Sequence, residues 1–387
     1  MVVQGISVFD GRPVEVTVDG GVIDRIDPLN GSGTSAGDLP LLSPGFLDMQ
    51  VNGYAGLDYS DERLEAAHLE RIADALAASG TTQHVPTIIT SPEALILRNL
   101  RTIASAVRTA RRVGTAVPGI HVEGPFISSE DGPRGAHNAT FVRGPDLAEL
   151  RRWRDAAEGL LLVVTVAPER PGALELISRA AEAGLLVAIG HSGARPEVIR
   201  DAVAAGARLS THLGNGSYTE LPRLENYIWE QLASDELTAG LIPDGFHLPG
   251  SVVKVFTRAK GMSRIVLVSD VSPLAGSPVG INSWMGQEVE VFADGHLGLP
   301  GTSILAGAGH LLDWGLAHFV RFTGRPLSEA VRLCTENPAR LLGLPRAYGR
   351  LEPGAPANIC LFRFEEGDDR LRVERTVCRG EEVAHAG

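Results

Sequence analysis

The chain has 387 residues, 44% of them hydrophobic and 21% charged, so it can bury one large core with a small satellite domain. The formal net charge of −12 and the lack of a Lys/Arg-rich block argue against a nucleic acid or membrane surface as partner. No segment has the pattern of a membrane span or a secretion signal. The widely spaced Cys334, Cys360 and Cys378 form no Cys-x-x-Cys pair. These features predict a cytoplasmic protein without a disulfide framework or thiolate metal site.

Both ends of the chain carry β-strand patterns. The alternation of Val14, Val16 and Val18 before a Gly-containing turn predicts an N-terminal hairpin. Stretches 359–364 and 371–378 predict two strands near the other end. We expect residues 1–44 and 346–387 to pair into one small β-sandwich domain.

Between the two ends, apolar strand-like stretches alternate with amphipathic helical ones. The helical stretches include 65–79, 92–112, 174–183 and 196–205. Eight strands are predicted at 45–51, 81–87, 116–123, 161–167, 185–191, 208–212, 238–244 and 264–270. Such βα units predict an α/β fold, a TIM (β/α)8 barrel over residues 45–345. A doubly wound open sheet is the alternative, but residues 45–56 lack its G-x-G-x-x-G turn.

Polar and ionisable side chains stand at the carboxyl ends of these strands, which converge on one face of a barrel. They are Gln50 and Asn52 on the first strand, Glu123 on the third, His191 on the fifth, His212 on the sixth, Asp244 and His247 after the seventh and Asp270 on the eighth. Buried charges are costly unless they are paired or bind a metal. We therefore predict a catalytic metal site with open coordination positions. The remaining histidines are interpreted as structural: His68, His84, His296, His310, His318 and His385.

Several sequence strings carry a resemblance to a known family. They are PGFLDMQVNG at 44–53, HVEGPF at 121–126, GAH at 135–137, GHS at 190–192, THL at 211–213, DGFH at 244–247, LVSD at 267–270, LAG at 305–307, NPA at 337–339 and the turn at 349–354. On these strings the chain resembles the amidohydrolase superfamily and, within it, the family of N-acetylglucosamine-6-phosphate deacetylases. The resemblance covers nearly the whole chain and implies amide hydrolysis of an N-acetylated amino sugar.

The metal set implied by the resemblance differs from that of many superfamily members. Strand one has Gln50-Val51-Asn52 where those members have His-x-His, and strand four ends in APE at 167–169, without Lys. Glu123 then looks like the substitute carboxylate. With His191 and His212 it resembles the deacetylase family's metal set, which implies one divalent ion per subunit, zinc first and other divalent ions as alternatives.

The mechanism we expect uses Asp270 twice. The metal lowers the pKa of its bound water, and Asp270 takes the water's proton. Asp270 then donates the proton to the departing amine, while the metal and either His137 or His247 stabilise the oxyanion. The alternative for Asp270 is a carboxylate that caps a turn or hydrogen-bonds a ligand histidine.

The resemblance also implies a substrate pocket. Its residues would be Ala136, His137, Asn215, Gly216, Arg223, His247, Leu305, Ala306 and Gly307. Arg223 would hold the substrate phosphate, often across the subunit interface of a homodimer, and a surface or salt-bridging arginine is the alternative. Residues 213–217 are LGNGS where the family usually has LFNAM, run 218–229 also departs, and loop 127–134 looks longer. We expect a pocket of altered shape.

Two other functions stay open. One is a related amidohydrolase reaction on a different N-acyl sugar, an N-acyl amino acid or a cyclic amide. The other is a catalytically inactive barrel that serves as a binding or assembly module. The joint presence of Glu123, His191, His212 and Asp270 favours an enzyme.

Overall fold

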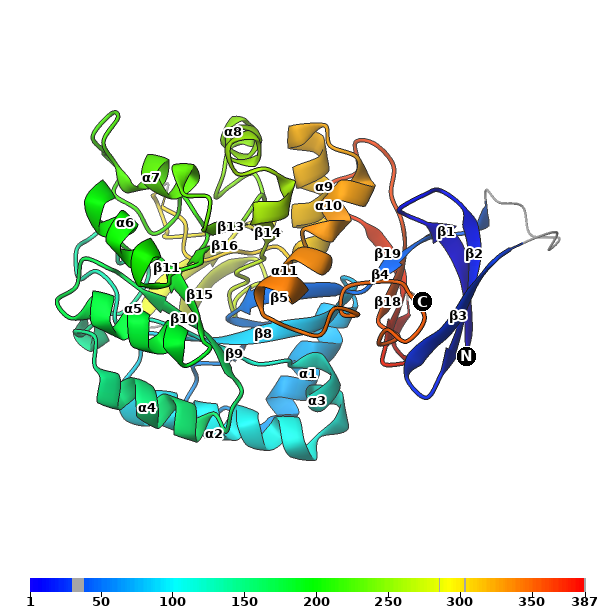
Figure 1. The fold of residues 1–387 in the computed structure, drawn as a ribbon, viewed down its shortest axis with the longest axis horizontal. Helices are drawn as coiled ribbons and strands as arrows, with labels where there is room; N and C mark the ends of the chain where they lie inside the picture. Colours follow the sequence, from blue (N-terminus) through cyan, green and yellow to red (C-terminus); the bar gives the residue numbers. More distant parts are fainter. Residues whose placement is uncertain (30–37, 285, 303, 386–387) are drawn as a thin grey trace.

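The structure is a computed structural model and describes residues 1–29, 38–284, 286–302 and 304–385. A barrel of parallel strands surrounded by helices lies beside a smaller sheet that holds both ends of the chain (Figure 1). None of the described helices combines the length and the apolar character needed to cross a lipid bilayer.

Eight parallel strands form the barrel, and strands consecutive in this series pair with one another. They are β5 (Phe46–Val51), β8 (Thr81–Ile89), β9 (Ile120–Glu123), β10 (Leu161–Val166), β11 (Leu186–Ile189), β12 (Leu209–Ser210), β13 (Thr238–Leu241) and β14 (Ile265–Leu267). A parallel bridge between Val51 and Val271 joins the first strand to the segment after the eighth. The predicted TIM-barrel fold is confirmed, and the carboxyl ends of all eight strands meet on one face.

Helices cover the outside of the barrel (Figure 1). They are α1 (Ala66–Ala77), α2 (Glu93–Thr109), α3 (Arg111–Ala116), α4 (Leu147–Ala156), α5 (Ala173–Glu182), α6 (Pro196–Ala205), α7 (Tyr227–Ala233), α8 (Gly250–Lys260), α9 (Leu312–Thr323), α10 (Leu327–Arg332) and α11 (Glu336–Leu341), with short 3₁₀ turns η2 (Ala139–Phe141) and η3 (Met262–Arg264). Local sequence sets their ends. Asp146 caps α4 by accepting from the backbone N–H groups of Ala148 and Glu149, and α6 starts at Pro196 and ends at Gly206, whose φ is 119°.

Several observed elements differ from the predicted bounds. The predicted helix 92–112 is two helices, and α3 occupies the first residue of the predicted strand 116–123, so that β9 starts at Ile120. β12 has two residues and β14 has three. Both strands end early because the chain leaves the extended conformation at the polar positions that follow: φ is 27° at His212 and 51° at Asp270.

Two small antiparallel sheets near the barrel mouth escaped the sequence analysis. β6 (Gly53–Tyr54) pairs with β7 (Leu57–Asp58). Between the eighth strand and α9, β16 (Gln287–Val291) pairs on one side with β15 (Gly280–Trp284) and on the other with β17 (Leu297–Gly298). These strands are short and lie outside the βα repeat, so the repeat pattern does not reveal them.

The two chain ends share one seven-stranded sheet, as the sequence predicts. Its order is β20 (Glu381–His385), β19 (Arg372–Cys378), β18 (Ile359–Arg363), β4 (Leu41–Pro44), β1 (Val2–Ser7), β2 (Pro13–Asp19) and β3 (Val22–Pro28). The antiparallel pair of β18 with β4 joins the C-terminal part to the N-terminal part. Because the chain passes from this sheet to the barrel between β4 and β5, we propose domain boundaries of 1–44, 45–345 and 346–387.

Candidate active site

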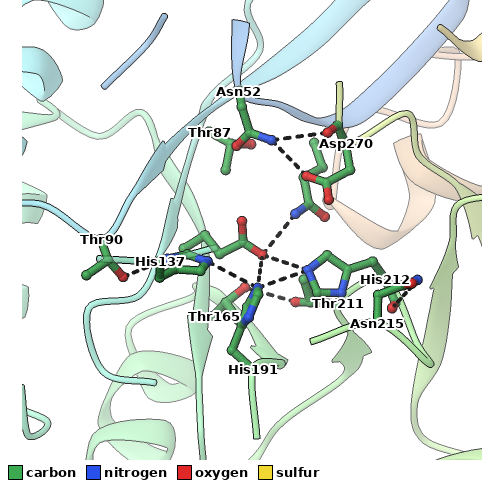
Figure 2. Close-up of polar contacts among 12 residues, drawn as sticks. Asn52, Thr87, Thr90, His137, Thr165, His191, Thr211, His212, Asn215 and Asp270 are labelled. Carbon is green, nitrogen blue, oxygen red and sulfur yellow. Dashed lines mark hydrogen bonds and ion pairs between the residues drawn. The ribbon is translucent and has the colours of Figure 1, made fainter. Parts of the chain in front are cut away.

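Three metal-binding side chains meet at the carboxyl face of the barrel. Glu123 ends β9, His191 lies two residues beyond β11, and His212 lies two residues beyond β12. Oε1 of Glu123 lies 3.3 Å from Nε2 of His191 and 3.2 Å from Nε2 of His212, and the two Nε2 atoms are 3.0 Å apart. All three side chains are buried, and Figure 2 shows the two imidazoles converging.

This donor set fits a divalent cation. Ligands that share a tetrahedral ion through bonds of about 2.0–2.1 Å stand roughly 3.3 Å apart, close to the separations found here. Nδ1 of His191 lies 3.0 Å from the carbonyl oxygen of Pro133. A proton on Nδ1 donated to that carbonyl leaves the Nε2 lone pair free to face the ion. Glu123, His191 and His212 thus form a group that could hold a divalent ion.

The electrostatics of the three groups favour positive charge at their meeting point. Burial would raise the pKa of the Glu123 carboxyl, but hydrogen bonds from His191 and His212 and their charges hold this pKa well below its usual range. Burial would lower the pKa of His212, but the hydrogen bond with Glu123 and the charges of Glu123 and Asp270 raise it to about 9. A divalent ion would supply positive charge at this point.

The first barrel strand supplies hydrogen bonds to the site. Nε2 of Gln50 donates to Oε1 of Glu123 at 2.9 Å. Nδ2 of Asn52 donates to Oδ1 of Asp270 at 2.8 Å, as Figure 2 shows. The two first-strand positions named from the sequence therefore orient the carboxylates of Glu123 and Asp270.

Asp270 is a half-buried carboxylate at the edge of the candidate metal site. Burial and the charge of Glu123 raise its pKa, the charge of His212 and the Asn52 hydrogen bond oppose that shift, and the balance is about 6. Like His191 (φ 50°) and His212, it has a positive φ, which is uncommon for a residue with a side chain. Strained backbone at three neighbouring polar positions is typical of a functional site.

A pocket of about 180 Å³ opens above the metal site. Of the residues predicted from the sequence, it is lined by Asn52, Glu123, Ala136, His137, His191, His212, Asn215, Gly216, His247, Asp270, Leu305 and Gly307. Gln50, Arg223 and Ala306 do not line it: Gln50 lies beneath it, Ala306 is buried and Arg223 is exposed. Ile89, Gly135 and Trp284 line the pocket without having been predicted.

Two further histidines face the pocket, and each is held by a neighbour. Nδ1 of His137 shares a 2.8 Å hydrogen bond with Oγ1 of Thr90, and its Nε2 lies 3.2 Å from Nε2 of His191. Nδ1 of His247 lies 2.7 Å from Oδ2 of Asp244, whose Oδ1 accepts from the His247 backbone N–H. Burial and the nearby charge of His191 lower the pKa of His137 well below its usual value, so its ring is neutral.

Sequence reasoning missed the buried polar residues beneath the pocket. Asp48 accepts backbone hydrogen bonds from Gln50 and Ser269, and it thereby joins the first strand to the residue before Asp270. His121, two residues before Glu123, shares a 2.8 Å hydrogen bond with Oγ1 of Thr165. An aspartate inside the apolar stretch 46–51 and a histidine on the same strand face as Glu123 were the available signals.

Comparisons with known proteins agree with this geometry. The model of the amidohydrolase family matches residues 41–383. The chain is 34% identical over 359 residues to N-acetylglucosamine-6-phosphate deacetylase of Mus musculus, covering 89% of this chain and 84% of that protein. It is 31% identical over 370 residues to N-acetylgalactosamine-6-phosphate deacetylase of Escherichia coli O157:H7, covering 95% and 94%.

A solved structure extends the likeness to the whole fold. It is an Asp-to-Ala mutant of N-acetyl-D-glucosamine-6-phosphate deacetylase from Mycobacterium smegmatis, in complex with N-acetyl-D-glucosamine-6-phosphate. Its TM-score is 0.86 at 28% identity, and the match covers 99% of each chain.

The barrel and its metal-binding strand ends define a metal-dependent hydrolase. The chain belongs to the amidohydrolase family, and it is a hydrolase that acts on an amide bond.

Proposed function

We propose that the protein deacetylates N-acetylglucosamine 6-phosphate, giving glucosamine 6-phosphate and acetate. The observation that carries this proposal is the meeting of Glu123, His191, His212 and Asp270 at one pocket in a chain whose relatives are sugar-phosphate deacetylases. The pocket offers a metal site, a carboxylate of raised pKa and polar side chains within one small volume. This combination suits metal-assisted hydrolysis of an amide in a small polar substrate.

We propose zinc as the metal, with Glu123, His191 and His212 as its protein ligands. One carboxylate and two imidazoles suit zinc and leave coordination open for water and substrate. When bound, the ion lowers the pKa of water and polarises the amide carbonyl.

Asp270 is the proton-transfer group of this proposal. Its Oδ1 accepts from Asn52, which leaves Oδ2 to receive a proton from the attacking water. A pKa of about 6 keeps the carboxyl mostly ionised at neutral pH and still basic enough to accept a proton. The same carboxyl then protonates the departing amine nitrogen.

Two histidines support the developing oxyanion and the substrate in this proposal. His137 is neutral and its ring edge faces the metal site, so a proton on Nε2 can be donated to the amide oxygen. His247, fixed by Asp244, faces the pocket as a partner for a sugar hydroxyl. Backbone groups of Ala136, Asn215 and Gly216 complete the sugar site.

We propose that Arg223 binds the substrate phosphate of a second subunit in a homodimer. Arg223 is exposed and does not line the pocket of its own subunit. It belongs to the loop between Tyr218 and α7, beside a groove of about 760 Å³ in which Leu224 and Trp229 are 73% and 47% exposed. Exposed apolar side chains next to a guanidinium that pairs with no carboxylate among the described residues suit a subunit contact that delivers the charge.

A cytoplasmic location is part of the same proposal. Cys334, Cys360 and Cys378 are buried free thiols. Free thiols are typical of a reducing compartment.

The test is hydrolysis by the purified protein loaded with zinc. Acetate and free amine should appear in equal amounts from N-acetylglucosamine 6-phosphate, and unphosphorylated N-acetylglucosamine should be a much poorer substrate. N-acetylgalactosamine 6-phosphate and N-acyl amino acids complete the panel. If an N-acyl amino acid or the galactosamine epimer is hydrolysed faster than N-acetylglucosamine 6-phosphate, the proposed substrate is wrong.

A further inference from the structure

The pocket has an apolar side that the proposed mechanism leaves without a role. Ile89, Trp284 and Leu305 line it, and we call these three residues the apolar wall. Ile89 ends β8, the second barrel strand, while Trp284 and Leu305 follow β14, the eighth. Since Val51 of β5 bridges to Val271, strands eight, one and two are neighbours, so the residues of the apolar wall come from adjoining parts of the barrel. Asn52, which follows β5, also lines the pocket there.

Further polar groups line the pocket away from the apolar wall. His137 follows the third strand, Asn215 the sixth and His247 the seventh. Asp270, which follows the eighth strand, stands beside the apolar wall. An N-acyl amino sugar is divided in the same way, because one amide links a polar sugar phosphate to a small apolar acyl group.

Trp284 is held firmly in its place on the apolar wall. Its indole N–H donates to Oδ2 of Asp58 on β7 at 3.0 Å, and Oδ1 of Asp58 accepts from the backbone N–H of Ser60. The ring also packs on the buried cluster that includes Val289 and Ala306. A Cβ added at Gly307 would lie 3.5 Å from the indole, at ordinary contact distance, so the ring lies directly beside the Gly307 backbone.

We propose that Trp284 closes the acyl end of the pocket and limits the length of the acyl group, with Asp58 as the positioning residue that holds the indole. This inference rests on the proposed amide hydrolysis. With the amide at the metal and Asp270, and with the sugar against the polar side, the acyl group points to the apolar wall. A rigid apolar wall discriminates by size, and one methylene more or less changes kcat/KM by roughly 10–200-fold.

The experiment compares kcat/KM over an acyl series on glucosamine 6-phosphate: N-formyl, N-acetyl, N-propionyl and N-butyryl. Wild type should lose at least about tenfold at each methylene beyond acetyl. Trp284→Ala should raise the butyryl-to-acetyl ratio at least about tenfold, because the cavity lengthens. Trp284→Phe keeps a ring but loses the N–H donor, so its butyryl-to-acetyl ratio should lie between those of wild type and Trp284→Ala. This variant remains informative where the alanine variant folds poorly.

Two variants test the tie to Asp58. Asp58→Ala removes the acceptor of the indole N–H and should raise the butyryl-to-acetyl ratio of kcat/KM, as Trp284→Ala does. Asp58→Asn keeps an acceptor oxygen, so its ratio should remain near that of wild type. Ile281→Thr is the matched control, because Ile281 lies on the same strand as Trp284 but is 56% exposed and does not line the pocket. It should leave the ratio unchanged.

Two results would overturn the proposal. One is an unchanged acyl ratio in Trp284→Ala. The other is a change only in the ratio of glucosamine to galactosamine substrates, which would place the indole against the sugar ring. If wild type hydrolyses no N-acyl amino sugar, the proposed function fails separately. The same series is then made on the N-acyl compound that is hydrolysed, where the acyl prediction still applies.

Discussion

The two sides of the pocket are built in different ways. The metal and proton-transfer side uses residues at the ends of barrel strands. Glu123, His191 and His212 are buried, Asp270 is half-buried, and Glu123 and Asp270 are held by Gln50 and Asn52. The proposed substrate contacts lie on segments inserted after strands: the β15–β16 hairpin with Trp284 and, for a neighbouring subunit, the loop with the exposed Arg223. Strand ends fix the chemistry, while inserted segments are free to change the substrate.

Metal removal should have the largest effect on turnover, because it disables the residues at the strand ends on which the chemistry depends. A zinc chelator should abolish turnover and lower the melting temperature, since buried Glu123, His191 and His212 are then left without their ion. Metal analysis, an activity assay and a thermal scan on the same sample measure this. Zinc added back should restore both. Full activity in protein shown to be metal-free would contradict a metal-dependent mechanism.

Asp270→Asn should come next, with kcat reduced about 1,000-fold, because proton transfer is lost while the amide keeps the shape of the carboxyl. The bound metal should stay near one ion per subunit by elemental analysis, since Asp270 is not among the three ligands. Near-normal kcat would make Asp270 a structural carboxylate.

Arg223→Ala tests the loop that follows the sixth strand, where Arg223 lies. It should raise KM for the phosphorylated substrate by about 10–100-fold, the value of a lost charge-assisted hydrogen bond, with a smaller effect on kcat. Steady-state kinetics on phosphorylated and unphosphorylated substrates separate phosphate binding from general damage. If both substrates respond equally or not at all, Arg223 is a surface arginine.

The smallest expected effect is on the pH dependence of the free energy of unfolding, through Asp48 on β5. Burial raises the pKa of the Asp48 carboxyl to about 7, although hydrogen bonds from Ser269 and Gln50 oppose the shift. The folded-state pKa lies above the unfolded one, so the stability that Asp48 contributes is present below about pH 4 and is lost as the pH rises to about 7, at most about 1.4 kcal/mol per pH unit. Asp48→Asn removes this titration.

Urea unfolding of wild type and Asp48→Asn at pH 5 and pH 8 measures the difference. The free energy of unfolding of wild type minus that of Asp48→Asn should be more positive at pH 5 than at pH 8. Other buried carboxyls titrate in both proteins and cancel in the comparison. A difference independent of pH would show that Asp48 keeps an ordinary pKa in the folded protein.

The same division explains what the sequence could predict. The barrel and the meeting of Glu123, His191, His212 and Asp270 follow from strand periodicity, because parallel strands bring their carboxyl ends to one face. Trp284 could not be found in this way. It reaches the pocket through an inserted hairpin, and its partner Asp58 lies 226 positions away along the chain. Asp48 was hidden for another reason, since its partners are backbone groups of two strands at opposite ends of the barrel sequence.

In the proposed binding mode, one pocket places the amide at the metal site formed by the strand ends and the acyl group against the β15–β16 hairpin. A crystal structure of Asp270→Asn with zinc and N-acetylglucosamine 6-phosphate would show this arrangement. We expect an amide carbonyl beside the ion held by Glu123, His191 and His212, the acetyl methyl against Trp284, and the phosphate at Arg223 of a second subunit. A substrate bound with its sugar ring on Trp284 and its acetyl group toward Asn215 would contradict it.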